Sequence, residues 1–300
     1  MIEYALELSA VSVFVGDATL EAPAMHVSNH TTAVVLPRVD GGQDTFAEAV
    51  LDAARAHSID LVVPLSDLEL MSLARHKQAF IDAGVCVVVS DPDVIAVTMN
   101  KKNATAHCRA NHITVPVTAF SAAEYDGPYP CIIKPVEGSA SAGLSVVEER
   151  GDLMKCRDGL DMIQARIDGT EYGIDILNDL AGDFVCATVK EKLLMRAGET
   201  DRSKIVKHAR LQNLSEVIAR TFRHIGNMDV DVIVDYDGNI YCIDFNARFG
   251  GGYPTTHAAG MNYLAALVDM AKGNTVKLPP APLAVTVVKG ISVHMIAASP

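Results

Sequence analysis

The stretch that most constrains the fold of this chain runs over residues 229–253, DVDVIVDYDGNIYCIDFNARFGGGY. Two runs in which apolar and polar residues alternate, 230–235 and 240–246, flank the pair Asp237-Gly238. Asp-Gly between such runs is a strong β-hairpin signal, because both central residues of a type I′ turn need φ > 0. We therefore expect an antiparallel hairpin that turns at these two residues.

This hairpin brings acidic side chains face to face. A two-residue turn places Asp231 opposite Asp244 and Asp229 opposite Asn246, and alternation puts all four on one face with Arg248. The opposite face is apolar, and we expect it to pack on a core: Val230, Val232, Val234, Tyr241, Ile243 and Phe245.

The acidic face needs a counter-ion, since like charges directly opposite each other destabilise a ladder. Oxygen ligands without His or Cys suit Mg²⁺ or Mn²⁺. The predicted metal ligands are Asp231, Asp244 and Asn246. The alternative is a solvated outer face of the hairpin.

The run IDFNARFGGGYP resembles the metal-binding strand of the ATP-grasp superfamily, whose pattern is roughly Glu-x-Asn-x-Arg. Asp244, Asn246 and Arg248 occupy those three positions. The glycines that follow let the backbone approach a ligand closely, because glycine has no side chain in the way.

The composition narrows the class of protein. A formal net charge of −12 argues against nucleic acid as the main partner, since binding to a phosphate backbone needs a basic footprint. No apolar run reaches the roughly 18 residues of a membrane span, and the N-terminus lacks the basic start of a signal peptide. The six scattered cysteines, without a C-x-x-C pair, predict reduced core thiols in a cytoplasmic protein.

The first 98 residues alternate between apolar, β-branched runs and helical patterns. The expected strands lie at 11–16, 33–37, 61–65 and 85–90. The expected helices lie at the N-terminus, at 44–57 and at 66–83, the last with a capping box of Ser66 and Glu69. Such alternation predicts parallel strands joined by βαβ crossovers. No G-x-G-x-x-G follows the first strand, so we expect a Rossmann-like domain without a nucleotide of its own.

Two lysines are candidate phosphate ligands in the next segments. A lone lysine such as Lys101 is most often a solvated surface residue, but IAVTMNKKNATAHCRANHITVP resembles the ATP-grasp segment in which a Lys reaches the α-phosphate. Lys101 matches that position better than Lys102, although Asn100 stands where the family usually has Asp.

Lys134 ends a strand, CIIKP, and the loop EGSASAG follows it. Small residues let backbone N–H groups fold over phosphate oxygens. The loop resembles the ATP-grasp glycine-rich loop, although Ala140 and Ala142 stand where Gly or Arg is common, and it is not a P-loop. Its candidate phosphate-binding residues are Gly138, Ser139 and Ser141; the alternative is a mobile hairpin loop with no ligand.

Two further segments complete the resemblance. In MIQARIDGTEYGIDILND the family places the hinge that pairs with adenine, here around Gln164, Ala165 and Ile167, and an acid for the ribose hydroxyls, here Glu171. In FVCATVKEKLLMRAGETDRSKIV a strand leads into a polar loop, RAGETDRS, that resembles the corresponding loop of carbamoyl-phosphate-synthase-type ligases. The resemblance places basic side chains there near the reacting phosphate or a carboxylate: Lys192, Arg196 and Arg202. A solvated basic face is the alternative.

The motifs cover essentially the whole chain in ATP-grasp order. The resemblance implies an α/β protein, α+β in its catalytic part: a Rossmann-like pre-ATP-grasp domain at 1–98 and an ATP-grasp domain at 99–300, with a lid subdomain at about 126–168. It is similar to the stand-alone, carbamoyl-phosphate-synthase-like carboxylate–amine ligases.

The implied reaction uses ATP with Mg²⁺ or Mn²⁺ to activate a small-molecule carboxylate as an acyl phosphate. An amine then attacks, and ADP and phosphate are released; Arg248 would stabilise the developing charge. Amino acids are candidate substrates and a homodimer is a candidate assembly, whereas neither nucleic acid nor a membrane is expected as a partner. Two alternatives stay open: a nucleotide-binding or sensing module without turnover, and a small-molecule kinase of the same fold.

Overall fold

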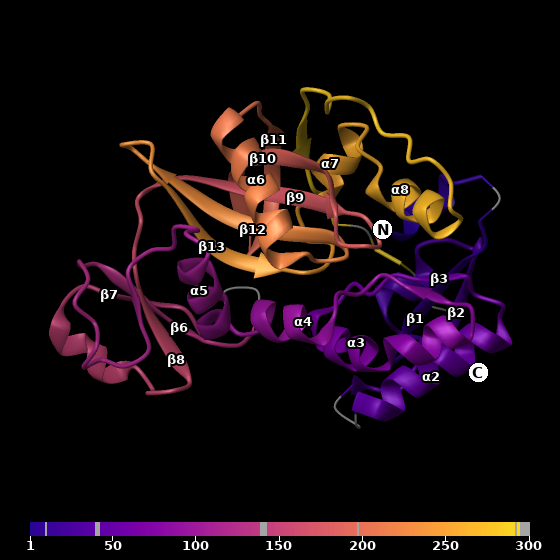
Figure 1. The fold of residues 1–300 in the computed structure, drawn as a ribbon, viewed down its shortest axis with the longest axis horizontal. Coiled ribbons are helices and arrows are strands. Elements are labelled where there is room, and N and C mark those ends of the chain that lie inside the picture. The colour runs from indigo at the N-terminus through magenta and orange to yellow at the C-terminus, as the bar shows by residue number, and fades with distance from the viewer. Residues whose placement is uncertain (10, 40–42, 139–142, 197, 292, 295–300) are drawn as a thin grey trace.

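The N-terminal domain alternates strands and helices as its sequence predicts (Figure 1). The computed structural model describes residues 1–300 except 10, 40–42, 139–142, 197, 292 and 295–300. The elements of this domain are α1 (Ile2–Leu6), β1 (Val13–Asp17), the 3-10 turn η1 (Pro23–His26), β2 (Thr31–Val35), α2 (Gln43–Ala56), β3 (Leu61–Val62), α3 (Asp67–Asp82) and β4 (Cys86–Val87). Strand β1 pairs in parallel with β2, and β3 with β4, which agrees with the crossover connections expected of a Rossmann-like domain.

Helix α3 begins at the predicted capping box. The Ser66 hydroxyl accepts a hydrogen bond from Leu68 N at 3.3 Å, and the Glu69 carboxylate accepts from Ser66 N at 2.8 Å and from Leu65 N at 2.7 Å. These bonds satisfy backbone donors that the helix itself leaves free. They fix the backbone around Asp67, the first residue of the helix.

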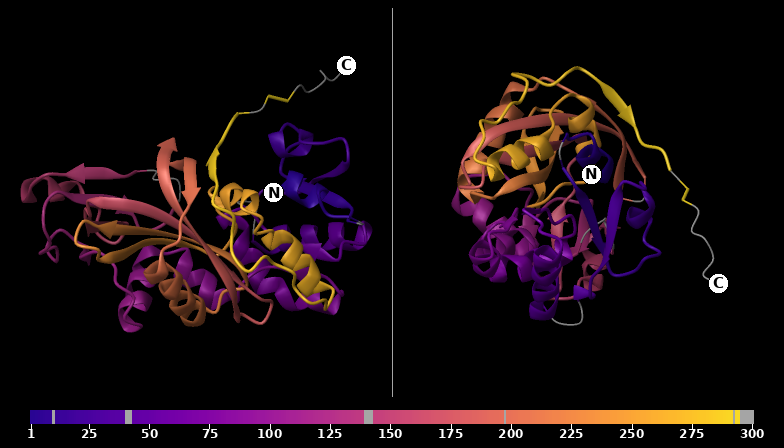
Figure 2. Two further views of the ribbon diagram at one scale, coloured as in Figure 1. Left: turned by 90° about the horizontal axis from the view of Figure 1, so that it is seen from above. Right: turned by 90° about the vertical axis from the view of Figure 1, so that its right-hand side faces the viewer.

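A small four-stranded unit with its own core, which we call the lid, follows two linking helices. These helices are α4 (Pro92–Thr98) and α5 (Lys101–Ala110), and the lid contains β5 (Thr118–Ala119), β6 (Cys131–Pro135), β7 (Ser145–Val147), the 3-10 turn η3 (Arg150–Lys155) and β8 (Asp161–Ala165). The four strands form an antiparallel sheet in the order β5-β8-β6-β7. Figures 1 and 2 show the lid strands β6 to β8 at one end of the molecule and the N-terminal domain at the other.

A six-stranded antiparallel sheet lies between these two parts. Its order is β13-β12-β9-β10-β11-β14. The strands are β9 (Gly169–Asn178), β10 (Phe184–Arg196), β11 (Glu199–Ile205), β12 (Gly226–Asp235), β13 (Ile240–Asn246) and β14 (Thr286–Val288). One face packs on helix α6 (Ala209–Phe222) and shares a single hydrophobic core with α2, α3 and α5. A second cluster lies around α7 (Tyr253–Ala258) and α8 (Tyr263–Ala271).

The turn between β12 and β13 differs from the expected type I′ turn. Asp235 N donates to Asn239 O at 3.0 Å, and of the pair Asp237-Gly238 only Gly238 has a positive φ, 83°. The Asp235 carboxylate accepts from the backbone N–H groups of Asp237 and Asn239. A longer loop closed by an aspartate side chain therefore replaces the two-residue turn.

A β-bulge restores the predicted register at the acidic pair. Next to the turn the partners are one residue off the expected pairing, with Val232 opposite Cys242. One extra residue, Ile243, then shifts the strand, so that Asp231 lies opposite Asp244. Bulges re-aim side chains and are frequent beside functional sites.

The bulge moves two residues off the face on which they were expected. Cys242, 1% exposed, takes the core position. Ile243 instead lines a cavity with Ile233, and Tyr241 pairs with Ile233 and is half-buried. The assignment of Tyr241 and Ile243 to the core face was therefore wrong.

Three other expectations are corrected or confirmed by the fold. The segment RAGETDRS is not an open loop, because β10 runs to Arg196 and β11 starts at Glu199. The helical segment after the glycine run is divided at Gly260, φ 85°, into α7 and α8. All six cysteines are free, as expected, and no helix in the described ranges is long and apolar enough to cross a membrane.

Candidate nucleotide and phosphate site

One face of the six-stranded sheet carries a pattern of alternating charges. Strand alternation turns acids of β9, β12 and β13 and lysines of β10 toward this face, while their neighbours enter the shared core. The charged residues are Glu171, Asp175, Lys190, Lys192, Asp229, Asp231 and Asp244. Each lysine lies between acids of neighbouring strands.

Lys192 bridges two of these acids. Its Nζ lies 2.7 Å from Glu171 Oε1 and 2.7 Å from Asp231 Oδ1. Burial opposes the charge on Lys192, but the two carboxylates outweigh it and raise its pKa. The pKa of Asp231 is raised to about 7, chiefly by burial. The charges of Asp229 and Asp244 also raise it, whereas Lys192 lowers it. The side chain of Asp231 stays 22% exposed, so it remains accessible from the cavity.

Lys190 forms a second, deeper bridge. It is fully buried, with Nζ 2.5 Å from Asp175 Oδ2 and 3.7 Å from Asp229 Oδ1, and Thr256 also donates to Asp175. A buried ion pair is tolerated only when such partners compensate its desolvation. Sequence reasoning missed this pair, although Lys190 lies two residues before Lys192 and so shares its face.

A cavity of about 260 Å³ opens where this face meets the lid. Most of the predicted nucleotide-binding residues line it: Lys101, Lys134, Gly138, Gln164, Ala165, Ile167, Glu171, Asp231 and Asp244. Apolar side chains complete the wall: Ile132, Leu144, Met195, Ile233 and Ile243. An apolar slot with cations and carboxylates at one end suits a base attached to a phosphate chain.

The two predicted lysines converge on Asp244 from different elements. Lys101, the first residue of α5, donates to Gly138 O at 2.7 Å and lies 4.0 Å from Asp244 Oδ1. Lys134, on β6, donates to Ile243 O at 3.4 Å. Burial lowers the pKa of Lys134, Asp244 opposes this, and Lys101 lowers it further. Two cations this close repel each other and favour an anion between them.

Asn100 replaces the family's usual Asp and has a structural role. Its side-chain oxygen accepts from the N–H groups of Lys102 and Asn103, which caps α5, and its amide donates to Glu137 at 3.0 Å. The cap orients Lys101 toward the cavity. Lys102 points elsewhere, with its Nζ 5.4 Å from the centre of the Phe120 ring.

Arg248 lies just beyond the cavity wall. It donates to Asp67 Oδ2 at 2.8 Å, to Phe249 O at 3.2 Å and weakly to Asn246 Oδ1 at 3.4 Å. Asp67 belongs to the N-terminal domain, and no sequence motif had pointed to it.

The glycine run lies directly against charged side chains. A Cβ at Gly250 would lie 2.1 Å from Asp229 Oδ2, one at Gly251 1.8 Å from Glu199 Oε2, and one at Gly252 2.6 Å from Lys190 Cε. Three glycines occur here because the backbone lies too close to these charged side chains to leave room for a Cβ, and not because the backbone needs a positive φ. Lys289 lies 3.9 Å from Glu199, so the segment after β14 also borders this region.

Some predicted residues do not line the cavity. Arg196 is bonded to Asp201 at 2.8 Å and its side chain is 59% exposed, and Arg202 lies on β11 and pairs with Val288 of β14. Ser139 and Ser141 lie outside the described residues.

The donor set fits a divalent cation in its chemistry. Two carboxylates in register and the Asn246 amide offer only oxygens, as Mg²⁺ prefers. Lys192 already neutralises part of the charge of Asp231. Lysines therefore supply part of the positive charge that the acidic face was expected to need. No cluster of three or more His, Cys, Asp or Glu side chains with metal-binding geometry occurs among the described residues, so a cation held by Asp231 and Asp244 would take the amide oxygen of Asn246 as a further ligand.

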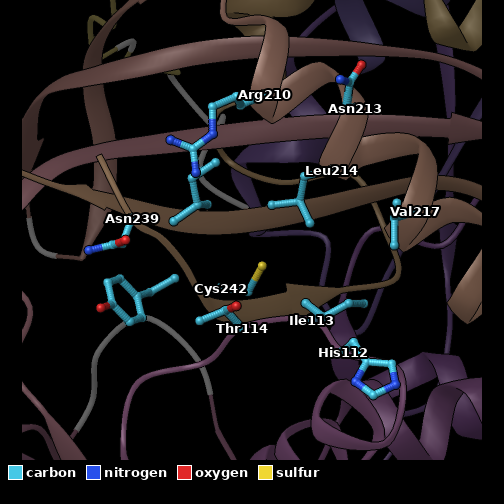
Figure 3. Close-up of a pocket in the computed structure, with 11 residues that line it drawn as sticks. His112, Ile113, Thr114, Arg210, Asn213, Leu214, Val217, Asn239 and Cys242 are labelled. Atoms are coloured by element: carbon cyan, nitrogen blue, oxygen red, sulfur yellow. The ribbon is translucent and has the colours of Figure 1, made fainter. Parts of the chain in front are cut away.

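A larger cavity, about 480 Å³, lies apart from these residues (Figure 3). It is formed by the loop after α5, the outer side of α6 and the start of β13, with Arg210 as its one cation among the described lining residues. Arg210 donates to Gly238 O at 2.5 Å. No carboxylate lines it, so the smaller cavity is the better candidate for phosphate chemistry.

Comparison with known proteins identifies the fold. Residues 160–296 match the family model described as ATP-grasp in the biosynthetic pathway with Ter operon, and residues 1–88 match the model of the PylC-like, N-terminal domain. Over residues 160–296 the chain is therefore similar to ATP-grasp proteins. The two matches follow the order of a Rossmann-like domain and an ATP-grasp domain.

Curated relatives of this chain include formate-dependent phosphoribosylglycinamide formyltransferases. The protein of Synechococcus sp. (strain CC9605) is 29% identical over 188 residues, which cover 60% of this chain and 43% of the relative. That of Burkholderia pseudomallei (strain 668) is 29% identical over 159 residues, 50% of this chain and 36% of the relative. The chain thus spans less than half the length of these relatives.

Solved structures share the ATP-grasp architecture over most of the chain. An L-amino acid ligase from Bacillus licheniformis superposes with a TM-score of 0.70 at 19% identity, covering 90% of this chain and 70% of that chain. An ADP complex of N5-carboxyaminoimidazole ribonucleotide synthetase superposes with a TM-score of 0.72 at 15% identity, covering 92% and 74%. At these identities the likeness concerns the fold.

Proposed function

We propose that this chain is an ATP-dependent carboxylate–amine ligase that forms an acyl phosphate and releases ADP and phosphate. The observation that carries the proposal is the convergence of Lys101 and Lys134 on Asp244, directly opposite Asp231, at the end of an apolar cavity. Such a site combines a slot for a base with charges for a phosphate chain. Relatives that include an L-amino acid ligase support small carboxylates and amines as substrates.

We assign each residue a role in the reaction from its position in the cavity. Lys101 and Lys134 would hold the phosphate tail, and Glu171, beside the hinge residues, would take the ribose hydroxyls. Mg²⁺ held by Asp231, Asp244 and Asn246 would neutralise phosphate charge, which is the main task in phosphoryl transfer. Lys192 would keep Glu171 and Asp231 in place until the nucleotide binds.

Arg248 would act on the transferred group. Arg248 follows β13 directly, two residues after Asn246, and its guanidinium donates weakly to the Asn246 side chain beside the glycine run. A planar set of donors stabilises charge that develops on the phosphoryl group and on the later tetrahedral oxyanion. The glycine run lets the backbone close around this intermediate, which must be kept from water.

The reaction can be tested directly. The protein is incubated with ATP, Mg²⁺ and a panel of amino acids, with and without an added amine, and ADP, AMP and phosphate are measured. We expect release of ADP and phosphate that depends on the acid, and a hydroxamate when hydroxylamine replaces the amine. AMP and pyrophosphate would contradict the proposal.

The same assay separates the alternatives. A stable phosphorylated product without free phosphate would favour a small-molecule kinase. Nucleotide binding without any turnover across the panel would favour a sensing module.

A further inference from the structure

The guanidinium of Arg248 is held by a carboxylate from the other domain. Arg248 Nη2 donates to Asp67 Oδ2 at 2.8 Å, although the two residues are 181 positions apart in the sequence. The side chains are 14% and 28% exposed, so this ion pair is better shielded than a surface pair. Through this contact the Rossmann-like domain reaches the proposed reaction centre.

Asp67 itself is firmly placed. It is the first residue of α3, directly after Ser66, and the capping box fixes the backbone on both sides of it. The N-terminal domain is in turn anchored on the large sheet: Ser90 Oγ accepts from Ile225 N at 2.9 Å, and both domains contribute to one core. The capping box and the shared core therefore hold the Asp67 carboxylate in one position.

Asp67 is the one charged group hydrogen-bonded to Arg248 in the described part of the chain. The other two bonds go to a backbone carbonyl and, weakly, to the Asn246 amide. Burial opposes the charge on Arg248, but the bond to Asp67 and the charges of Asp67, Asp229 and Asp244 outweigh burial and raise its pKa. Without Asp67, the remaining carboxylates would draw the guanidinium toward the metal-binding face.

We propose that Asp67 is a positioning residue for the ligase reaction: it holds the Arg248 guanidinium away from the acidic metal-binding face and aimed at the transferred phosphoryl group. The Rossmann-like domain thereby completes the active site. This inference rests on the proposed function. A displacement of about 1 Å in such a group can reduce the rate roughly a hundredfold, so a positioning carboxylate has a large effect without touching the substrate.

The variant Asp67→Asn tests the proposal, because it keeps the size and an acceptor oxygen but removes the charge. We expect kcat to fall by about 10- to 100-fold while KM for ATP stays within about twofold. Asp67→Glu, which restores the charge, should recover part of the rate. Ser90→Ala is the matched control: it removes an interdomain hydrogen bond that does not contact Arg248, and it should lower stability and leave kcat unchanged.

A double-mutant cycle shows whether the effect passes through Arg248. In an Arg248→Lys background, Asp67→Asn should change kcat by less than about threefold, because an ammonium gains little from being oriented. An equal loss in both backgrounds would mean that Asp67 acts independently of Arg248, which overturns the proposal. A rise in kcat or a lower KM for the carboxylate in Asp67→Asn would also overturn it, since Asp67 would then be a competitor for Arg248.

A second measurement needs no turnover, so failure of the proposed function and failure of this inference can be told apart. In protein with ¹⁵N-labelled arginine, the Nη signals of Arg248, assigned by their loss in Arg248→Lys, should be sharp in wild type and broadened in Asp67→Asn. Unchanged signals in Asp67→Asn would show that Asp67 does not hold the guanidinium, whatever reaction the protein catalyses.

Discussion

At the scale of single residues, the site is organised around two lysines of β10, each of which pairs with one acid of β9 and one acid of β12. Glu171 and Asp231 share Lys192, and Asp175 and Asp229 share Lys190. Asp244 is different, because its nearest cation, Lys101, is 4.0 Å away. Asp244 is therefore the acid most available to a metal ion or a phosphate-bound cation.

Asp244→Ala should nearly abolish turnover while the protein stays folded. The change removes a proposed metal ligand, yet it also relieves repulsion with the facing Asp231, so the free energy of unfolding should change by less than about 1 kcal/mol. Turnover at saturating Mg²⁺ and urea unfolding measure the two effects. Asp237→Ala is the control, because it removes the same charge at the exposed turn. Turnover of Asp244→Ala above a tenth of the wild-type value would refute the assignment of Asp244 as a metal ligand.

His224 makes stability depend on acid pH. It is fully buried, Nε2 donates to Ile176 O at 3.1 Å, and Nδ1 accepts from the Asn178 amide, so both nitrogens are satisfied in the neutral form. Burial lowers the pKa of His224 from 6.5 to about 4. Below pH 6.5 the unfolded chain binds a proton that the folded chain does not, so stability falls as the pH falls toward 4.

The expected loss between pH 7 and 4.5 from this one group is about 2–3 kcal/mol. Urea unfolding at both pH values should show a smaller difference for His224→Gln than for wild type. His30→Gln, at an exposed histidine, should keep the full wild-type dependence. An identical pH dependence in all three proteins would exclude His224 as the cause.

At the scale of elements, the glycine run and the bulge place the site. The bulge at Ile243 sets which residues of β13 face the cavity, and the glycine run passes over the charged face. The three glycines are not equivalent, because the groups they contact differ in mobility. Glu199 is 60% exposed and can turn away, whereas Lys190 is enclosed on all sides.

Gly252→Ala should destabilise the protein by about 1–3 kcal/mol, because its Cβ would displace the buried Lys190 from Asp175. Gly252 has φ −80°, so no backbone strain is involved. Gly251→Ala should cost less than about 1 kcal/mol, since Glu199 can move. Thermal or urea unfolding of the Gly252→Ala and Gly251→Ala proteins measures the two losses of stability. Gly290→Ala is the control, because a Cβ at Gly290 would meet no neighbouring atom. Equal losses of stability in the three variants would contradict the prediction.

At the scale of the whole molecule, the two large domains share one core and the lid has its own. Helices α2, α3 and α5 pack with α6 against the large sheet, whereas seven buried residues form the lid cluster. A shared core predicts that the N-terminal domain and the large sheet unfold together. The small lid core predicts earlier, separate opening of the lid.

The reactivity of buried cysteines can show whether the lid opens before the shared core unfolds. Cys108 on α5 and Cys242 on β13 belong to the shared core, and Cys131 belongs to the lid core. In pulsed alkylation along a urea gradient, read by mass spectrometry, Cys108 and Cys242 should become reactive at one midpoint and Cys131 at a lower one. Coincident midpoints for all three would mean that the lid is not an independent unit.

Much of the site could be predicted from local patterns. The lysines at 101 and 134, residues 164, 165 and 167, and the acids at 171, 231 and 244 line one cavity, as expected from the motifs. The roles assigned to these residues remain predictions. The turn chemistry was predicted wrongly, because the Asp235 side chain satisfies a longer loop that no two-residue pattern describes. The register at Asp231 nevertheless matched, since the bulge compensates for the longer turn.

The sequence by itself determined the strands, the faces that carry charge and the order of the domains, because side-chain alternation and capping are local properties of the chain. Only the tertiary structure decided how those charges are balanced. Lys190 reaches Asp175, and Asp67 reaches Arg248 across 181 residues, through packing of whole elements that no local pattern encodes. The Asp67–Arg248 pair depends on where the shared core docks the N-terminal domain, and that is set by the sum of many weak contacts rather than by any single motif.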